Sequence, residues 1–390
     1  MKTTLVRLSQ LALLAAGIDS AMAQPPQVSA ANNPMEVDPA EYLDRIELPE
    51  GFSISIYASG LEAARSMALA DDGTLYVGSL GPLGGPAVGK VYAVTDKNRD
   101  GRADEVLTIL EGLNFPNGVA LRDGSLYVAE LNRILRYDQV ATRLHDMPAP
   151  VVVNDSFPDD YMHGWKFINF GPDGKLYVPV GGPCNTCESE KEIYATINRM
   201  NADGSGLEIF ARGVRNSVGF DWHPVTGELW FTDNGRDLWG DTTPPEELNH
   251  APVAGLHFGF PYRYGKTLVD SDYSTSLSAS DFTPAALEIP AHNAGLGIEF
   301  YTGSSFPAQY RNQLFAAYHG SWNRNPPDGY KIRLMRFENN QAVGFEDFAS
   351  GWMIDDKYWG RPVDIELMPD GSMLVSDDFN GVIYRIAYGK

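Results

Sequence analysis

The stretch 213–237 gathers polar and charged residues at one end of a predicted β-hairpin. Its two arms, 218–222 and 228–232, are apolar, aromatic and β-branched, and they are separated by turn-forming residues. Antiparallel arms place the start of the first arm beside the end of the second. Arg215 and Asn216 are therefore expected at the open end of the hairpin, facing the loop that follows the second arm. Polar groups held there by a rigid scaffold are suited to binding a ligand.

The same hairpin signature recurs along the chain. Its second arm begins with a leucine-like residue at Leu75, Leu126, Leu176, Leu229, Leu314 and Met373. Most intervals are about fifty residues, which suits one four-stranded blade, and strand signals dominate over helical periodicity. The sequence therefore predicts an all-β fold, a six-bladed β-propeller of four-stranded antiparallel blades. A β-sandwich would not repeat one hairpin at this period.

The rest of the chain is assigned around this propeller. We expect a signal peptide at 1–23, an extended N-terminal segment at 24–47 and the propeller at 48–390, with residues 52–57 completing the last blade. Residues 238–294 are expected to form a long excursion on the functional face. The net charge of −21 argues against nucleic acid as a partner, and no other apolar run is long enough for stable membrane insertion. These features predict a periplasmic or secreted protein.

In a ring of such hairpins, the starts of the first arms meet on one face around the channel. Arg65, Arg215 and Arg361 occupy related starts, with His163 at another. Three guanidinium groups at a channel mouth suggest a planar polyanion, bound through paired hydrogen bonds. Taken singly, each arginine is more often a surface residue, and His163 alone is more often a structural histidine.

Three motifs carry a family resemblance: HGWKFINFGPDGKLYV at 163–178, HGSWNR at 319–324 and GRPVDI at 360–365. Together with Arg215 and Asn216, they resemble the pyrroloquinoline-quinone (PQQ)-dependent glucose/sorbosone dehydrogenases, a family that includes soluble aldose sugar dehydrogenases. The resemblance covers 48–390. It implies a quinoprotein that uses PQQ and Ca²⁺ to oxidise an aldose or related sugar. Electrons would pass to a separate acceptor of cytochrome or quinone type.

The resemblance also assigns roles to single residues. His163 falls on the catalytic base, which takes the hydroxyl proton while hydride passes to the quinone C5, and Arg215 on the group that stabilises charge at the C5 oxygen. The backbone carbonyls of Gly235 and Arg236 match the calcium ligands. The residues expected to bind the cofactor are Arg65, Asn216, Arg324 and Arg361. We expect Arg324 to take the place of a lysine that contacts the cofactor in the family, with Lys331 as the second choice. The candidate residues for stacking against a sugar are Trp165, Trp239, Trp322 and Trp359, and each of them could instead pack a loop.

Two further motifs lie outside this set. The oxygen-bearing residues Asp96, Asn98, Asp100 and Asp104 have the spacing of a calcium loop, and a metal-free Asp-rich turn is the equal alternative. Cys184 and Cys187 are the only cysteines, and in an oxidising compartment we expect a local disulfide between them.

Two other functions remain open. A calcium-dependent propeller lactonase or esterase would share the architecture, but its channel should be lined by metal-binding carboxylate and amide side chains, which three arginines fit poorly. A non-catalytic binding module would need no cofactor and should expose an apolar patch. Fold alone does not decide between these possibilities.

Overall fold

A computed structural model of the protein describes residues 33–80 and 88–389. The predicted leader at 1–23 and the first part of the N-terminal segment lie outside these residues. No helix in the described ranges is long and apolar enough to cross a membrane.

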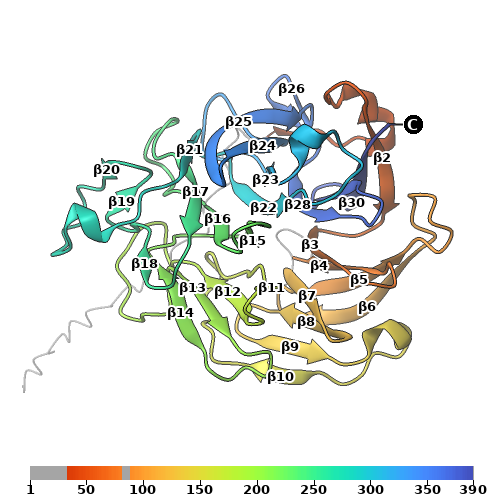
Figure 1. The fold of residues 1–390 in the computed structure, drawn as a ribbon, viewed down its shortest axis with the longest axis horizontal. Helices are drawn as coiled ribbons and strands as arrows, with labels where there is room; N and C mark the ends of the chain where they lie inside the picture. The colour runs from red at the N-terminus through yellow and green to blue at the C-terminus, as the bar shows by residue number, and fades with distance from the viewer. Residues whose placement is uncertain (1–32, 81–87, 390) are drawn as a thin grey trace, which may run out of the picture.

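Six antiparallel sheets are arranged in a ring, which confirms the predicted six-bladed propeller (Figure 1). Blade 1 consists of β3 (Ala64–Leu69), β4 (Leu75–Ser79), β5 (Gly89–Thr95) and β6 (Glu105–Leu113). Blade 2 consists of β7 (Gly118–Arg122), β8 (Ser125–Ala129), β9 (Ile134–Tyr137) and β10 (Val151–Asn154). Blade 3 consists of β11 (Asn169–Phe170), β12 (Leu176–Val180), β13 (Thr196–Met200) and β14 (Glu208–Arg212).

The second half of the ring continues the same order. Blade 4 consists of β15 (Phe220–Trp222), β16 (Leu229–Asp233), β17 (Glu246–Ala251) and β21 (Leu287–Ile289). Blade 5 consists of β22 (Gly295–Phe300), β23 (Leu314–Tyr318), β24 (Lys331–Glu338) and β25 (Gln341–Ala349). Blade 6 consists of β28 (Pro362–Leu367), β29 (Met373–Asp377), β30 (Val382–Tyr388) and the early strand β2 (Phe52–Ser59).

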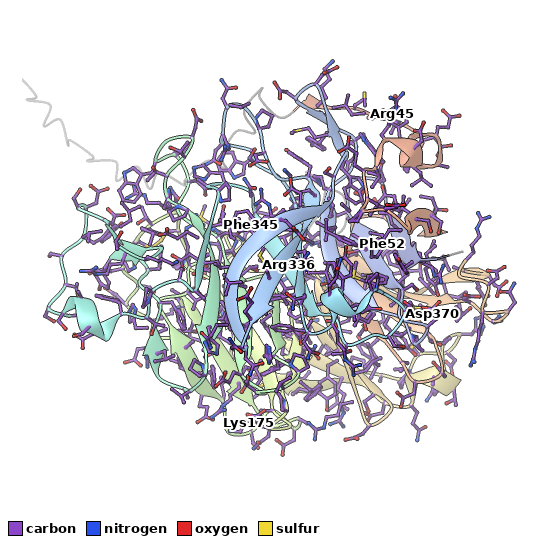
Figure 2. All side chains as sticks on the ribbon, turned by 45° about the horizontal axis from the view of Figure 1, so that its top comes forward. Arg45, Phe52, Lys175, Arg336, Phe345 and Asp370 are labelled. Atoms are coloured by element: carbon purple, nitrogen blue, oxygen red, sulfur yellow. A yellow bond between two sulfur atoms is a disulfide. The ribbon has the colours of Figure 1, made fainter. Side chains whose placement is uncertain are left out.

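The ring is closed by pairing the first blade-forming strand with the last one. β2 runs antiparallel to β30, with Phe52 opposite Tyr388, as the sequence predicted for residues 52–57. Phe52, labelled in Figure 2, also makes edge-to-face contacts with Phe306 and Phe348 of blade 5. This pairing covers the outer edge of β30 and joins the two ends of the propeller.

The hydrophobic core lies between neighbouring blades, because alternate residues of a strand point to opposite faces. In β4, Leu75 and Val77 pack with the side chains of blade 6. Tyr76, between them, packs instead with Leu126 and Val128 of blade 2. The repeated LYV signature is thus the pattern of a strand that is buried on both faces.

Residues 238–294 differ from the expected single excursion. They include β17 and β21, the two outer strands of blade 4. Between these strands, β18 (Leu256–His257) adds parallel to β14 of blade 3, and β19 (Arg263–Tyr264) pairs with β20 (Leu268–Val269); a 3₁₀ turn, η3, follows at Ala279–Asp281. The sequence of β17, EELNHA, is polar, so it lacks the apolar pattern by which a strand is predicted.

The N-terminal segment is also less extended than predicted. Asp38 caps the short helix α1 (Pro39–Tyr42) by accepting a hydrogen bond from Ala40, and proline occupies the first helical position.

The described residues contain three further 3₁₀ turns, η1 (Leu43–Arg45), η2 (Val140–Thr142) and η4 (Ala308–Tyr310). A small sheet joins β1 (Asn33–Pro34), β27 (Lys357–Tyr358) and β26 (Met353–Ile354).

Candidate functional site

A cavity of about 610 Å³ lies where the first strands of the blades begin and the second strands end. It brings together five residues for which the sequence predicted a catalytic, cofactor or metal role, and two of the candidate stacking tryptophans: Arg65, His163, Arg215, Asn216, Gly235, Trp165 and Trp322. The first five come from blades 1, 3 and 4 and their connections, so the ring itself assembles the site. The lining surface is largely apolar and aromatic, which is typical of a small-molecule pocket with a few orienting polar groups.

His163 is held in a defined orientation and protonation state. Its Nδ1 lies 2.8 Å from the carbonyl oxygen of Gly182, which accepts but cannot donate a hydrogen bond. Nδ1 therefore carries the proton, and Nε2 of the neutral ring is an acceptor. Burial, and then the charge of Arg215, lower the pKa of His163 to about 3. The ring is thus neutral across the physiological range and can accept a proton at Nε2.

The close approach of Gly181 to His163 needs a residue without a side chain. A Cβ atom at position 181 would lie 2.4 Å from Cβ of His163. His163 itself has a φ of +53°, a conformation that few non-glycine residues adopt. The backbone at both positions is therefore shaped to bring the imidazole against the strand that ends at Val180.

Arg215 is fixed by nearly all of its hydrogen-bond donors. Nε and Nη2 donate to the carbonyl and side-chain oxygens of Asn185 at 2.8 and 2.9 Å. Nη2 also donates to Asp237 at 2.9 Å, and Nη1 to the carbonyl of Asn234 at 3.0 Å. Four of its five N–H groups are therefore used within the protein. The guanidinium supplies a fixed positive charge at the cavity wall.

Buried carboxyl groups hold the backbone at the open end of the hairpin. Asp233 accepts hydrogen bonds from the amides of Arg215 and Asn216 at 2.9 and 2.6 Å. Glu246 accepts one from the amide of Gly235 at 2.9 Å. Burial raises the pKa of Asp233 to about 7 and that of Glu246 to about 8. These contacts place the Arg215-Asn216 turn beside the loop after β16, as the hairpin pattern predicted.

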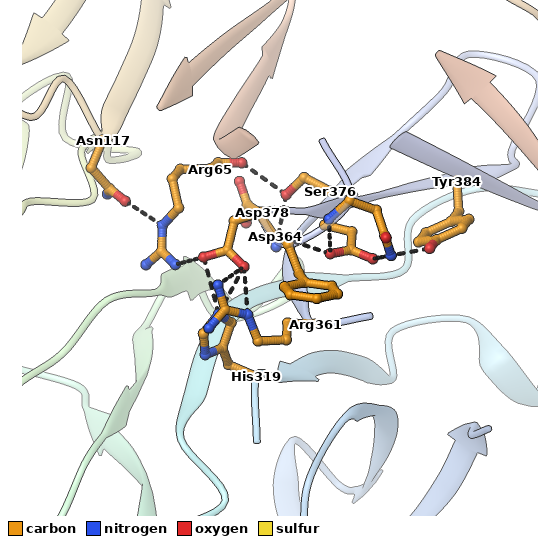
Figure 3. A network of polar contacts seen from close by, with 11 residues as sticks. Arg65, Asn117, His319, Arg361, Asp364, Ser376, Asp378 and Tyr384 are labelled. Carbon is orange, nitrogen blue, oxygen red and sulfur yellow. Dashed lines mark hydrogen bonds and ion pairs between the residues drawn. The ribbon is translucent and has the colours of Figure 1, made fainter. Parts of the chain in front are cut away.

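A second cluster of charges lies on the blade 1 and blade 6 side of the cavity (Figure 3). Asp378 accepts hydrogen bonds from Nη1 of Arg65 and Nε of Arg361, both at 3.0 Å, and lies 3.0 Å from Nε2 of His319. Burial alone would raise the pKa of Asp378, but Arg361, His319 and Arg65 bring it well below its usual value. The predicted ring of arginines is therefore not three free cations, because two of them share one carboxylate.

Several predicted cofactor residues lie outside the cavity lining. Arg361 does not line the cavity; it binds Asp378, which in turn contacts the lining residues Arg65 and His319. Arg324 donates to the carbonyl oxygens of Pro326 and Ala291 at 3.2 and 3.0 Å. Lys331, the second choice, pairs with the carboxylates at 328 and 347. The side chains of Arg324 and Lys331 are therefore bound to other groups, and neither lines the cavity.

The candidate calcium ligands are backbone and amide oxygens. Gly235 lines the cavity, and no N–H group of the described residues donates to the carbonyl oxygen of Gly235 or Arg236. The side-chain oxygens of Asn234 and Asn323, both in cavity-lining residues, are buried and have no hydrogen-bond partner among the residues that the structure describes. Such oxygens suit a hard cation. Within the described ranges, no group of three or more His, Cys, Asp or Glu side chains is arranged to hold a metal ion.

The loop of Asp96, Asn98, Asp100 and Asp104 uses its oxygens in local turns. Asp96 accepts from the amides of Asp100 and Gly101, and Asp104 accepts from the amide of Lys97 at 2.6 Å. These are the contacts of an Asp-rich turn. A second calcium site in this loop stays a prediction.

The four candidate stacking tryptophans divide into two pairs. Trp165 and Trp322 line the cavity, and Trp165 makes an edge-to-face contact with the exposed ring of Tyr161 at 5.5 Å. Trp239 lies under the guanidinium of Arg236, and Trp359 is fully buried in the core. Only the first pair can meet a ligand in the cavity.

The predicted disulfide between Cys184 and Cys187 is present. No sequence pattern indicated a role for Asn185, which lies between them, or for Glu246 in the polar strand β17. Both residues hold the site through contacts with segments more than ten residues away. One signal could have pointed to Asn185. The cysteine pair follows the second strand of a blade, and this is the position at which site residues were expected in the other blades.

The fold and the cavity together define a six-bladed propeller with a ligand-sized site at the channel mouth, in which a few polar groups are set among apolar and aromatic residues. Residues 38–386 match the family described as a domain of unknown function, DUF7133, and the chain belongs to this family. An uncharacterized protein of Borreliella burgdorferi is 36% identical over 365 residues, covering 90% of this chain and 93% of the relative.

Two structural neighbours share the propeller. A Trichoderma reesei protein of carbohydrate-active enzyme family AA12 has a TM-score of 0.74 and 20% identity, covering 92% of this chain and 100% of its own. The PQQ domain of pyranose dehydrogenase from Coprinopsis cinerea has a TM-score of 0.71 and 19% identity, covering 88% of this chain and 97% of its own. In sequence, the PQQ-dependent pyranose dehydrogenase of this fungus is 24% identical over 202 residues, 42% of this chain and 27% of that enzyme.

Proposed function

We propose that the protein is an oxidoreductase, a PQQ-dependent dehydrogenase of sugar hydroxyl groups. The observation that carries this proposal is the neutral imidazole of His163 in the cavity wall, with Nδ1 bound to Gly182 and Nε2 left as an acceptor. A proton acceptor beside a fixed guanidinium is the pair of groups that hydride removal from an alcohol requires.

The cavity wall fits an anionic, planar cofactor. Arg65 uses two of its five N–H donors, on Asn117 and Asp378, and Nη2 has no partner among the described residues. The side-chain amide of Asn216 is likewise without a hydrogen bond to the described chain, and Arg215 retains one N–H group. We assign Arg65, Asn216 and Arg215 as the groups that hold the cofactor's carboxylates and quinone edge.

Each side chain then has a distinct role. His163 takes the hydroxyl proton at Nε2, while Gly182 keeps the Nδ1 proton in place. Arg215 stabilises negative charge that develops in the cavity, and its fixed geometry avoids reorganisation during the reaction. When bound, the quinone supplies the hydride acceptor. The carbonyl oxygens of Gly235 and Arg236 are the ligands we assign to Ca²⁺.

The names of similar proteins agree with PQQ as the cofactor and a sugar as the substrate. The Coprinopsis cinerea enzyme is a PQQ-dependent pyranose dehydrogenase, and a neighbour from Streptomyces coelicolor is a PQQ-bound aldose sugar dehydrogenase, at 20% identity and a TM-score of 0.61. The cavity aromatics Trp165 and Trp322 agree with a sugar substrate, since sugars present apolar faces to aromatic rings. We further propose that the chain is exported and passes its electrons to a separate acceptor.

A titration with cofactor and sugars tests the proposal. PQQ and Ca²⁺ are added to the purified apo-protein, binding is followed by quinone absorption, and a panel of aldoses is supplied with an artificial electron acceptor. Saturable binding with sugar-dependent reduction of the quinone is the expected result. Binding without reduction would reject the sugar substrate, and the absence of binding would reject the cofactor and return the lactonase and binding-module interpretations.

A further inference from the structure

The loop closed by the disulfide reaches into the site through one side chain. Asn185, between Cys184 and Cys187, contacts both Arg215 and Asp237. It accepts two hydrogen bonds from Arg215, one at its backbone carbonyl (2.8 Å) and one at Oδ1 (2.9 Å). Asn185 therefore binds the guanidinium group of Arg215 through two hydrogen bonds. Two hydrogen bonds fix the plane of the group as well as its position.

Asn185 is also locked to the loop that follows β16. Its Oδ1 accepts from the amide of Asp237 at 2.7 Å, and its Nδ2 donates to the carbonyl of Asp237 at 3.0 Å. Asp237 in turn accepts from Nη2 of Arg215 at 2.9 Å. Asn185, Asp237 and Arg215 thus form a closed triangle of contacts, and three different segments of the chain meet in it.

This triangle controls a group that the cavity depends on. Arg215 is 97% buried at its side chain, since only 3% is exposed, and its partners leave it little freedom. Without Asn185, two of its four hydrogen bonds would be lost or weakened. The guanidinium would then be held only by Asp237 and the carbonyl of Asn234, and its plane would no longer be fixed.

We propose that Asn185 is a positioning residue for Arg215, and that the Cys184–Cys187 disulfide holds Asn185 in place for this purpose. The chemical role of Arg215 rests on the proposed function, whereas the positioning itself does not. A disulfide that closes so short a loop limits the conformations open to Asn185, so the contact with Arg215 costs less conformational entropy.

The disulfide can be removed in two ways that leave the rest of the chain unchanged. Both cysteines are partly exposed, so a dithiol such as dithiothreitol has access to them. Each disulfide takes two electrons and two protons from the dithiol, which gives two cysteine thiols and the cyclic disulfide of the reagent. The double variant Cys184→Ala/Cys187→Ala lacks the bond without any reagent.

The first measurement needs no cofactor. Hydrogen exchange of the amide of Asp237, which is bound to Oδ1 of Asn185, is followed by mass spectrometry in the full-length protein. We expect faster exchange after reduction, in Cys184→Ala/Cys187→Ala and in Asn185→Ala. Asn185→Asp keeps the oxygen that accepts from Asp237 but replaces the Nδ2 donor with a second oxygen, so it should restore only part of the protection. Asn198→Ala, which removes a buried asparagine elsewhere in blade 3, is the matched control and should leave Asp237 unchanged.

The second measurement is the affinity for PQQ in the presence of Ca²⁺. We expect the loss of Asn185 or of the disulfide to weaken binding about tenfold, the size of one lost charge-assisted hydrogen bond. Reduction should have no further effect on Asn185→Ala, because the disulfide acts through Asn185. Reduction that weakens Asn185→Ala as much as the wild type would overturn the proposal, as would unchanged exchange at Asp237 in all variants. Altered exchange in a protein that binds no PQQ would uphold the positioning and reject the proposed function.

Discussion

Nδ1 of His163 donates a hydrogen bond to the carbonyl oxygen of Gly182, 2.8 Å away. The amide of Gly182 donates in turn to the carbonyl oxygen of Arg215, also at 2.8 Å. One backbone residue therefore connects the proposed base with the fixed guanidinium. The arrangement sets the tautomer of the imidazole and its distance from the positive charge at the same time.

His163→Ala is expected to lower turnover by a factor of about 10² to 10⁴, the usual contribution of a general base. PQQ affinity should stay close to that of the wild type, because no cofactor contact is assigned to His163. Steady-state kinetics and a quinone titration separate the two effects, with thermal unfolding as the control for folding. Undiminished turnover in the folded variant would remove His163 from the mechanism.

The protonation state of His163 can be measured in the ligand-free protein. Its pKa is lowered to about 3, first by burial and then by Arg215, so the ring should stay neutral between about pH 5 and 8. Nitrogen-15 NMR should show a protonated Nδ1 and an unprotonated Nε2, with His163→Ala identifying the signals. A titration of this ring near pH 6.5, the ordinary value for histidine, would contradict the assignment.

Arg65 and Arg361 are expected to differ, although both bind Asp378. Arg65 lines the cavity with unused donors, so Arg65→Ala should weaken PQQ binding about tenfold to a hundredfold. Arg361 does not line the cavity, and Arg361→Ala should act mainly on the free energy of unfolding. Quinone titration and chemical denaturation of both variants test this contrast. Equal losses of affinity would show that Arg361 also touches the cofactor.

The sequence predicted those parts of the molecule that depend on local pattern. The repeated hairpin predicted the ring, and the ring placed Arg65, His163 and Arg215 around one cavity. The sequence pattern could not predict which residues these three side chains contact, because those contacts are set by tertiary packing. Arg65 and its counterion Asp378 are 313 residues apart and meet only because the propeller closes.

The absence of an apolar pattern explains why the strand β17 of blade 4 was missed. The polar strand β17 is buried at five of its six positions, and its two glutamates accept hydrogen bonds from the backbone amides of Gly235, in the cavity lining, and Gly265. A sequence pattern identifies strands by apolar alternation, so a strand that serves the site with buried polar side chains escapes it.

Asp378→Asn should destabilise the protein by about 3–5 kcal/mol, since it leaves two buried guanidinium groups without their carboxylate. The pKa of Asp378 in the folded protein lies well below its unfolded value, so its contribution to stability is present above about pH 4 and is lost as the pH falls. Urea denaturation at several pH values should therefore show the largest difference between wild type and variant near neutrality. A difference that grows as the pH falls would contradict this account.

Four acidic residues at the other end of the channel should have the opposite pH dependence. Glu299, Asp364 and Glu366 line a second cavity of about 150 Å³, and Asp221 lies on the neighbouring inner strand β15. Burial raises the pKa of Asp221 and Asp364 to about 7, and it raises the pKa of Glu299 and Glu366 well above the usual value for a glutamate. Repulsion between the carboxylates raises the pKa of Glu299, Asp364 and Glu366 further. The folded state therefore binds more protons than the unfolded state, so this group favours folding most at low pH and least once the pH exceeds about 7.

Glu299→Gln removes one of these charges without removing an observed hydrogen bond of the described residues. We expect the variant to be more stable than the wild type at about pH 8 and to lose less stability between about pH 5 and 8, because repulsion within the group is reduced. Glu111→Gln, on the exposed part of β6, is the matched control for the loss of a carboxyl group. Denaturation of the three proteins across this range measures the effect. If Glu299→Gln is less stable at the higher pH, the carboxylate of Glu299 has a stabilising partner, and the repulsion inferred in the channel is wrong.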